Sequence, residues 1–362
     1  MYKVINVISD SNIGGAGKCI LNFLKYYDEN KFEVIAVIPK NSLLKAEIEK
    51  LKKPYYEIDG LSDKSLDFKV ISSLKRYFKE QKPDIIHCHA AMSARIAGKF
   101  TKKAKVIYTR HSVFEPSKTI SKGLGKIING AVNNFFADKI IAVAEAAKDN
   151  LVKTGVSSKK IIVVKNGVEP LEKIPVKRDD NSFVLGIAAR LTEVKGHIYI
   201  LRALKKLICE GCNVTLKIAG TGPFEKEIKD EINRLKINDN VKMLGFVTDV
   251  KSFNNSIDLN VNASFGTEAT SLSLLEGMSL GIPAVVSDFG GNPGVIYDGK
   301  NGFLFKTKDS DDMYEKLKKV IYDKELYKKM QKSCIEIFNS EFTAEIMTKN
   351  IENVYSDVLK VR

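Results

Sequence analysis

The chain has 362 residues, of which 44% are hydrophobic and 9% aromatic, and its formal net charge is +14. This length exceeds what a single ordinary core organises, so two globular domains are expected. No apolar run approaches the roughly 18 residues of a transmembrane helix. The first ten residues have the pattern of a strand entering a turn, with no secretory signal. Five scattered cysteines fit a reducing compartment, so we expect a cytoplasmic protein.

The positive charge lies in the first half of the chain. Residues 1–175 hold 31 Lys and Arg against 18 Asp and Glu, whereas residues 176–362 hold 27 against 26. The electrostatic field of these positive side chains would attract an anionic membrane surface, at the inner face of the plasma membrane. The alternative, which stays open, is that the positive side chains only increase solubility. The sequence contains no helix-turn-helix, zinc or RNA-binding signature, so no nucleic acid partner is expected.

In the first half, short β-branched runs alternate with amphipathic stretches, the pattern of parallel sheets built from strand–helix–strand units. Helices are expected over Lys18–Tyr27 and Ser65–Gln81. The expected strands are Lys3–Ile8, Phe32–Ile38, Asp84–Cys88, Lys105–Thr109, Lys139–Val143 and Ile161–Val164.

A linker rich in proline and charge, Glu169–Ser182, separates this series from a second one. It predicts two domains, residues 1–170 and residues 171–343. The strands expected in the second are Phe183–Ala188, Val214–Ala219, Val241–Leu244, Leu259–Asn262, Ala284–Ser287 and Gly302–Phe305. Two doubly wound, Rossmann-like α/β domains would bind ligands at the carboxyl ends of their strands, facing a common crevice.

A glycine-rich turn follows the first strand, with Gly14, Gly15 and Gly17 opening a helix. Glycines there let the backbone approach an anion closely. A Walker loop is excluded because Cys19 stands where it needs Ser or Thr, and a dinucleotide fingerprint because Ile20 stands where it needs glycine. The alternative is a tight turn without a ligand.

Two cations, Arg190 and Lys195, follow the first strand of the second domain. A leaving diphosphate gains negative charge in the transition state, and two cations at this place would stabilise it. His111 follows the strand Lys105–Thr109 and would project into the crevice, to bond a sugar hydroxyl or a backbone group. His87 and His89 have no third metal ligand at the usual spacing, so structural roles are expected for both.

Three further signals have simpler explanations. The pair Cys209 and Cys212 has metal-site or redox spacing but falls at a helix end and has no second pair. Asp309 is expected to cap a helix over Met313–Tyr322. An apolar stripe with lysines at its start would pack in the core or lie on a membrane surface, and both alternatives stay open. The stripe comprises Ile120, Leu124, Ile127, Ile128, Ala131 and Phe135, and its lysines are Lys118, Lys122 and Lys126.

Two carboxylates, Glu268 and Glu276, frame the start of a helix expected near Ser271. The free backbone N–H groups near Thr270, Ser271 and Leu272 would hold a phosphate at the positive end of that helix. The carboxylates would then accept hydrogen bonds from neighbouring hydroxyls. A phosphate flanked by hydroxyls describes a nucleotide sugar.

From end to end the chain resembles the retaining glycosyltransferases of family 4, the group 1 glycosyltransferases with the GT-B fold. The resemblance rests on the order and spacing of several short motifs. They are Gly14–Gly17, Asp84–His89, Thr109–His111, Ala137–Val143, Asn166–Val168, Arg190 with Lys195-Gly196, Ala219–Pro223, Ala263-Ser264 with Glu268 and Glu276-Gly277-Met278, and Gly281–Asp288.

The resemblance implies a role for each matching residue. Glu268 would hold donor-sugar hydroxyls, Glu276 the ribose, and Arg190 with Lys195 the diphosphate. The backbone at Ser271 and Leu272 would bind the distal phosphate. The remaining assignments are His111 to the donor sugar, Gly14 and Gly15 to the phosphates and acceptor, and Gly245-Phe246-Val247 to the base. The helix at about residues 344–362 would cross back onto the N-terminal, acceptor-binding domain.

Two positions depart from the family pattern, because Ser271 stands where glycine is frequent and Thr270 where phenylalanine is common. Neither removes a charged group. The resemblance also implies transfer with retention of configuration, in which the leaving phosphate takes the acceptor proton. Neither a general-base carboxylate nor a metal ion is then required.

The sequence therefore predicts a retaining glycosyltransferase that uses a nucleotide sugar, with UDP favoured. A lipid-linked glycan in cell-surface polysaccharide synthesis is the expected acceptor. One alternative is a sugar-nucleotide epimerase, hydrolase or phosphorylase of the same two-domain plan. Another is a non-catalytic sugar-nucleotide-binding protein, which would be expected to lack Arg190, Lys195 or Glu268, yet all three are present.

Overall fold

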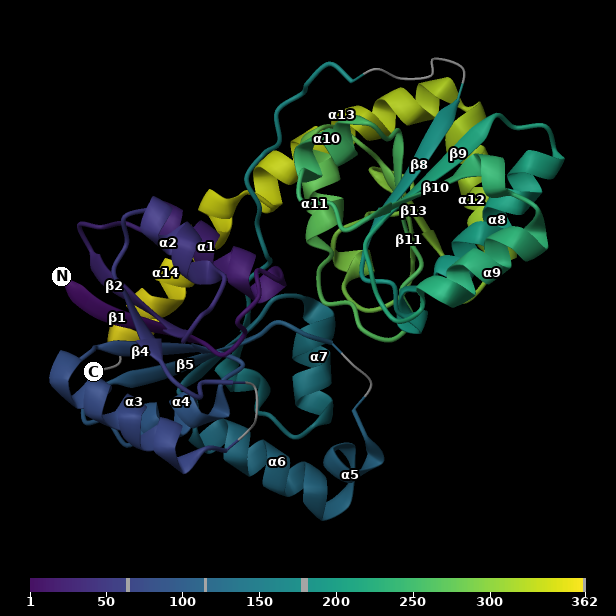
Figure 1. The fold of residues 1–362 in the computed structure, drawn as a ribbon. Coiled ribbons are helices and arrows are strands. Elements are labelled where there is room, and N and C mark those ends of the chain that lie inside the picture. Colours follow the sequence, from purple (N-terminus) through teal and green to yellow (C-terminus); the bar gives the residue numbers. More distant parts are fainter. Residues whose placement is uncertain (63–65, 114–115, 177–181, 361–362) are drawn as a thin grey trace. The chain divides into compact units, whose positions relative to one another are not determined.

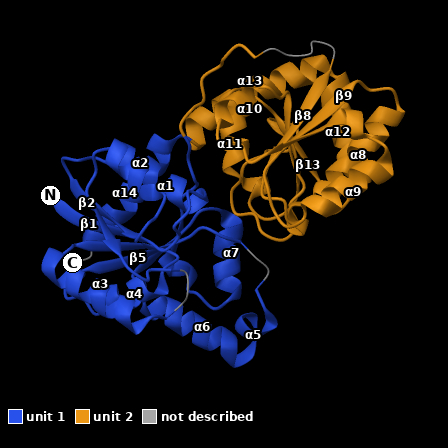
Figure 2. Cartoon of the chain, in the orientation of Figure 1, with its two compact units in different colours: residues 1–168, 343–362 blue, residues 169–342 orange. Residues whose placement is uncertain are grey.

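The computed structural model describes residues 1–62, 66–113, 116–176 and 182–360. The chain forms two compact units, which are coloured separately in Figure 2. Unit 1 comprises Met1–Val168 and Thr343–Arg362, and unit 2 comprises Glu169–Phe342. Among the described residues, no helix combines the length and the apolar character needed to cross a bilayer.

Unit 1 is built on a seven-stranded parallel sheet with the order β3-β2-β1-β4-β5-β6-β7 (Figure 1). Its strands are β1 (Tyr2–Ile8), β2 (Phe32–Pro39), β3 (Tyr55–Ile58), β4 (Ile85–His89), β5 (Lys105–Arg110), β6 (Lys139–Ala142) and β7 (Ile161–Val163). Its helices are α1 (Gly15–Tyr26), α2 (Leu44–Lys50), α3 (Phe68–Gln81), α4 (Met92–Lys99), α5 (Lys118–Ser121), α6 (Gly123–Phe135), α7 (Glu145–Lys153) and α14 (Ala344–Lys360).

The alternation of side chains along β1 divides the core of unit 1 into two layers. Val4 and Ile8 pack in the cluster that contains residues of α1, α2 and α14. Ile5 and Val7 pack in the cluster that contains residues of α3 and α4. Successive side chains of a strand point to opposite faces, so a strand buried on both faces is mostly apolar, as β1 is from Val4 to Ile8 apart from Asn6.

Unit 2 repeats this plan with a six-stranded parallel sheet in the order β10-β9-β8-β11-β12-β13. Its strands are β8 (Phe183–Ala188), β9 (Val214–Ala219), β10 (Val241–Gly245), β11 (Leu259–Asn262), β12 (Ala284–Ser287) and β13 (Gly302–Phe305). Its helices are α8 (His197–Cys209), α9 (Glu225–Leu235), α10 (Val250–Asn255), α11 (Leu272–Ser279), α12 (Ser310–Tyr322) and α13 (Lys324–Glu341).

All twelve strands expected from the sequence are present, and no end differs from its expected position by more than one residue. The sequence prediction missed β3, a four-residue strand at the edge of the sheet. Helix α1 begins at Gly15 instead of Lys18, and α3 begins at Phe68 with Asp67 as its cap. The expected start of that helix, Ser65, lies outside the described residues. Asp309 caps α12 through the N–H groups of Asp311 and Asp312, as predicted.

The C-terminal helix α14 belongs to unit 1, where it packs beside α1. Tyr355 is its anchor: the ring is fully buried and makes edge contacts with Phe23 and Phe32, with centroids 5.7 and 5.5 Å apart. The hydroxyl lies 2.7 Å from Nδ1 of His87. The last helix of the chain therefore completes the core of the first unit.

Candidate active site

The loop after β8 brings Lys195 against Glu268 in unit 2. Lys195 Nζ donates to Glu268 Oε2 at 2.8 Å and to the carbonyl of Thr267 at 3.2 Å. The carboxylate is only 8% exposed and the lysine side chain 17%. Two partly desolvated opposite charges at this distance attract strongly, which fixes both side chains at the carboxyl ends of the strands.

Glu268 accepts two further hydrogen bonds, which the sequence analysis did not anticipate. Asn262 Nδ2 donates to Oε2 at 3.2 Å, and the Ser264 hydroxyl donates to the same oxygen at 3.1 Å. All three bonds that hold the carboxylate therefore fall on one oxygen. The signal in the sequence is the polar pair of Asn262, the last residue of β11, and Ser264, two residues after it.

Close backbone contacts hold these loops in place. Gly196 has φ +70°, and a Cβ there would lie 2.1 Å from the carbonyl oxygen of Ala263. Gly290 has φ +61°, and a Cβ there would lie 2.2 Å from the carbonyl oxygen of Glu268. Only glycine allows such approaches, so the loops after β8 and β12 rest directly against the segment that carries Glu268.

Helix α11 starts where the sequence predicted, with Ser271 as its cap residue. The first N–H groups of a helix have no partner within the helix and carry partial positive charge. Thr270, Ser271 and Leu272 thus surround an end of α11 suited to a phosphate. Glu276 lies on the second turn and is 8% exposed.

An apolar cavity of about 320 Å³ lies at the carboxyl ends of β8, β9 and β10. Arg190 and Val247 both line it, with Phe246, Gly220 and Thr221. Arg190 is exposed, and Phe246 is 76% exposed at the rim. A flat, largely apolar group would fit here beside a cation, as a nucleotide base beside its phosphates requires.

In unit 1, His111 follows β5 and its Nε2 atom lies 2.8 Å from Nδ1 of His89. His87 is held by Tyr355 and, through Nε2, by the Thr109 hydroxyl at 2.6 Å, so its expected structural role is confirmed. Burial lowers the pKa of His111 to about 4. Burial and the charge on His111 lower the pKa of His87 to about 3. His87 and His111 are therefore neutral near pH 7.

Gly14 caps α1 in unit 1, and Gly15 is the first residue of that helix. A Cβ on Gly14 would lie 3.5 Å from Oδ2 of Asp10. A carboxylate beside this helix end favours a ligand that donates hydroxyl hydrogens and opposes a phosphate. Gly17 instead packs closely on Leu44 of α2. Gly17 therefore serves close packing, whereas Gly14 leaves room for a ligand beside the end of α1.

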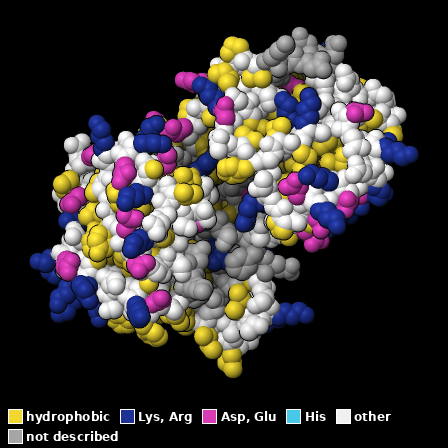
Figure 3. Space-filling model, viewed as in Figure 1, with side chains coloured by type: hydrophobic (Ala, Val, Ile, Leu, Met, Phe, Trp, Pro, Cys, Tyr) yellow, Lys and Arg dark blue, Asp and Glu magenta, His cyan; other side chains and the backbone are white. Residues whose placement is uncertain are grey.

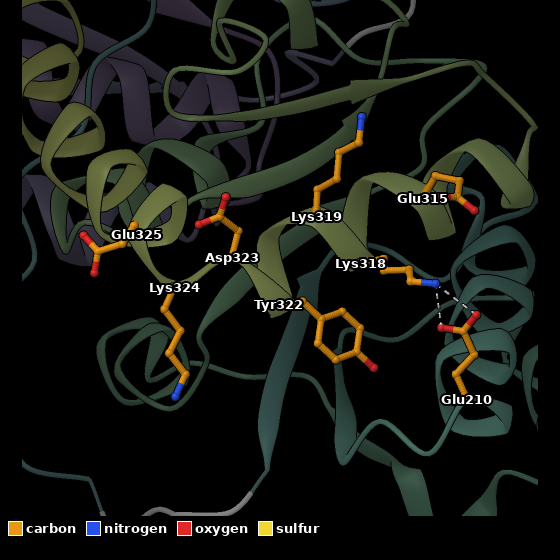
Figure 4. A pocket seen from close by; sticks show the side chains of 8 residues that line it. All are labelled: Glu210, Glu315, Lys318, Lys319, Tyr322, Asp323, Lys324 and Glu325. Atoms are coloured by element: carbon orange, nitrogen blue, oxygen red, sulfur yellow. Dashed lines mark hydrogen bonds and ion pairs between the residues drawn. The ribbon is translucent and has the colours of Figure 1, made fainter.

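Unit 2 also has a wide groove between the end of α8 and the junction of α12 and α13 (Figure 4). Lys318 and Glu210 pair across it: Lys318 Nζ lies 3.0 and 3.1 Å from the two Glu210 oxygens, and the Tyr314 hydroxyl donates to Glu210. The end of α8 precedes β9, so this groove lies at the amino edge of the sheet, away from the ligand edge.

The described residues contain no cluster of His, Cys, Asp or Glu with the geometry of a metal site. All five cysteines are free, Cys209 being exposed and Cys212 half-buried.

Comparison with known proteins identifies the family. The model described as "Glycosyl transferases group 1" matches residues 169–336, and "Glycosyltransferase Family 4" matches residues 13–171. The capsular polysaccharide biosynthesis glycosyltransferase CapM of Staphylococcus aureus is 24% identical, over 81% of this chain and 82% of its own length. The UDP-Gal:alpha-D-GlcNAc-diphosphoundecaprenol alpha-1,3-galactosyltransferase of Escherichia coli is 27% identical, over 81% of this chain and 80% of its own.

The fold also matches a solved structure with bound ligands. Anabaena Alr3699/HepE in complex with UDP and glucose superposes with a TM-score of 0.83 at 21% identity, covering 99% of this chain and 100% of that one. Together with two parallel-sheet, Rossmann-like units, these matches show the GT-B architecture. The chain belongs to the group 1 glycosyltransferases of family 4.

Proposed function

We propose that the protein is a retaining glycosyltransferase that moves a hexose from a UDP-sugar to a lipid-linked glycan acceptor in cell-surface polysaccharide synthesis. The observation that carries this proposal is the constellation in unit 2. It combines the Lys195–Glu268 pair, the start of α11 and the apolar cavity beside Arg190. Each element matches one chemical part of a nucleotide sugar.

The base would occupy the cavity beside Phe246 and Val247. Arg190 and Lys195 would neutralise the diphosphate, whose distal phosphate would face the start of α11 at Thr270, Ser271 and Leu272. No metal ion is required if these cations carry that charge. Glu276 would accept hydrogen bonds from the ribose. These groups all lie in unit 2.

Glu268 would orient the donor sugar with the oxygen that is not committed to Lys195, Asn262 and Ser264. A carboxylate with one oxygen held threefold and the other available suits accepting a sugar hydroxyl. In unit 1, His111 would contact the donor sugar as a neutral imidazole. Gly14 and Gly15, which the sequence assigned to the phosphates and the acceptor, would lie beside the acceptor, because the Asp10 carboxylate near Gly14 opposes a phosphate there.

In the transfer, the bond from the anomeric carbon to the diphosphate breaks and a bond to the acceptor oxygen forms on the same face. The acceptor proton passes to the leaving phosphate oxygen. No protein carboxylate acts as a base in this scheme. Cations that bind the diphosphate more strongly as its charge grows lower the barrier.

The relatives support the choice of donor and acceptor. One is named as a UDP-Gal transferase to a diphosphoundecaprenol acceptor, and a structural neighbour holds UDP and glucose. An acceptor of this kind lies at a membrane, which suits a cytoplasmic enzyme peripheral to the inner face of the plasma membrane. The positively charged first half of the chain is consistent with an anionic surface there.

A thermal-shift panel of UDP, GDP and their sugars tests the donor. We expect UDP and UDP-sugars to stabilise the protein and Arg190→Ala to abolish the shift, whereas the matched variant Arg76→Ala, in unit 1, retains it. Stabilisation by none of the nucleotides contradicts the proposal. With an acceptor present, NMR of the product measures the anomeric configuration, and an inverted product contradicts retention. Free sugar released without acceptor indicates a hydrolase instead.

A further inference from the structure

Helix α6 of unit 1 has its amphipathic character reversed relative to an ordinary surface helix. Leu124, Ile127, Ile128 and Phe135 are 75, 66, 61 and 55% exposed. With the exposed Ala131 they recur at the spacing of one helical face. A surface helix normally buries such a face. Here Gly130 is the buried residue of the helix.

The opposite side of α6, which contacts the protein, is polar. Asn129 Nδ2 donates to the carbonyl of Thr154 at 2.7 Å, and Asn134 Oδ1 accepts from the N–H of Ser157 at 3.0 Å. Asn133 Oδ1 accepts from Arg95 at 3.0 Å. The helix is thus anchored to unit 1 through its amides, and its apolar face is not needed to hold it there.

A glycine contact fixes the orientation of the helix. A Cβ on Gly130 would lie 2.2 Å from the carbonyl oxygen of Gly155, in the turn after α7. A Cβ on Gly155 would lie 2.3 Å from the carbonyl oxygen of Lys126. Rotating α6 to bury its apolar face would force larger side chains into this contact, so the fold holds that face outward.

Lysines accompany the apolar face at both ends. Lys118, Lys122 and Lys126 are exposed at its beginning, and residues 116–137 contain neither Asp nor Glu. At the other end, Lys99 lies 5.4 Å from the ring centroid of Phe135 and 3.6 Å from Asp138. Figure 3 shows hydrophobic side chains exposed over α5 and α6, with a cationic group beside α5.

The apolar surface continues onto the end of α4. Phe100 is 58% exposed, and its ring centroid lies 6.5 Å from that of Phe136. Lys102 and Lys103 follow it and are exposed. We define the α6 face as Leu124, Ile127, Ile128, Ala131, Phe135 and Phe100 with the lysines named above.

We propose that the α6 face is a docking surface for an anionic lipid bilayer, in which α6 lies in the plane of the membrane interface. Apolar side chains would enter the acyl boundary while the lysines contact anionic headgroups. A second copy of the chain fits less well. A stable protein interface buries roughly 800 Å² per partner, more than one narrow helix face offers, and two such faces would bring their lysines together.

The inference names the surface for the membrane association in the proposed function, but it does not rest on the transfer reaction, because membrane binding requires neither donor nor acceptor. The chain contains no tryptophan, so all tryptophan fluorescence of a variant with one introduced tryptophan comes from that position. Ile128→Trp places the reporter on the α6 face, and Phe68→Trp places the control at an exposed site of α3 in the same unit. Both variants are made in the full chain.

The first measurement is tryptophan emission with vesicles of phosphatidylcholine alone or mixed with phosphatidylglycerol, at low and high salt. We expect a blue shift for Ile128→Trp with the anionic vesicles at low salt and none for Phe68→Trp. Equal shifts with both vesicle types overturn the anionic preference, and no shift with either overturns the proposal. Blue-shifted emission before vesicles are added, with a doubled mass in sedimentation equilibrium, assigns the face to a second copy instead.

The second measurement is co-sedimentation with the anionic vesicles. Ile127→Gln/Ile128→Gln should weaken binding by about tenfold or more while the melting temperature is retained, because both side chains face outward. Binding to the vesicles should also weaken in the triple variant Lys118→Gln/Lys122→Gln/Lys126→Gln. The control is a triple variant in unit 2 that loses the same charge, Lys226→Gln/Lys324→Gln/Lys329→Gln, and its binding should be retained. Equal effects of the two lysine triples contradict the proposal. UDP binding should be unchanged in all these variants, so a negative result for membrane docking can be distinguished from a negative result for donor binding.

Discussion

His89 Nδ1 and His111 Nε2 lie 2.8 Å apart, and the two rings stack with their centroids 5.0 Å apart. A hydrogen bond between two neutral imidazoles needs one proton, so the tautomer of His89 decides which nitrogen of His111 carries hydrogen. Burial, followed by the charges on His87 and His111, keeps the pKa of His89 well below its ordinary value. His89 is therefore placed to orient His111.

Replacing His89 tests this relationship. His89→Leu removes the partner of His111, and we expect kcat to fall about tenfold with little change in KM for the donor, as the loss of one positioning hydrogen bond implies. His89→Asn, whose amide lies near the position of Nδ1, should recover part of the rate. Equal losses in both variants, with lowered melting temperatures, would indicate a purely structural role.

The stability of unit 2 should depend on pH through His197, a buried residue whose pKa burial and then Lys195 lower from 6.5 to about 4. Between these values the unfolded chain binds more protons than the folded one, so the free energy of unfolding rises with pH there. Acidification from pH 6.5 to about 4 should cost about 2–3 kcal/mol at this residue. Urea unfolding of His197→Leu should show a correspondingly flatter pH profile; parallel profiles contradict the assignment.

A double-mutant cycle can distinguish the structural role of the Lys195–Glu268 pair from its proposed role in donor binding. Lys195→Met leaves a buried carboxylate without its cation and should destabilise the protein by about 3 kcal/mol. Adding Glu268→Gln should restore part of that stability in chemical denaturation. Transferase activity should remain lost in the double variant, because both groups are proposed to contact the donor. Recovered activity would argue against those roles.

Gly196→Ala tests how the loop after β8 is held. The new Cβ would collide with the carbonyl of Ala263 at a residue with positive φ, so a loss of more than about 2 kcal/mol is expected. Gly294→Ala is the control, since a Cβ there meets no atom within 4 Å. Similar melting temperatures for both variants would contradict the close contact.

Phe246 at the rim of the apolar cavity should contribute to base binding. Phe246→Ala is expected to weaken UDP binding about five- to tenfold, within the usual range for an aromatic contact. Tyr322→Ala, in the groove of Figure 4, removes an aromatic side chain from the other groove and should leave UDP binding unchanged. Calorimetric titration with UDP measures both, and equal affinities would place the base elsewhere.

Much of the fold is encoded by short segments of the sequence and could therefore be predicted. The apolar runs of β1 and β8 and the caps at Asp309 and Ser271 are encoded within a few residues. The edge strand β3 was missed because only four residues pair, on one side. At the proposed donor site, Lys195 was predicted from its position after a strand, and Glu268 from its position before the helix that begins near Ser271. Asn262 and Ser264, which hold the same carboxylate oxygen, were not.

The sequence by itself determined the two parallel α/β units and the loops that carry the charged groups, because strand and helix periodicity are properties of neighbouring residues. It did not determine that His89 meets His111, since that contact depends on the register that pairs His89 with Thr109 across β4 and β5. Nor did it determine which side of α6 faces outward. The glycine contact between Gly130 and Gly155 decided that, by joining residues far apart in the chain through a fit that only the folded backbone creates.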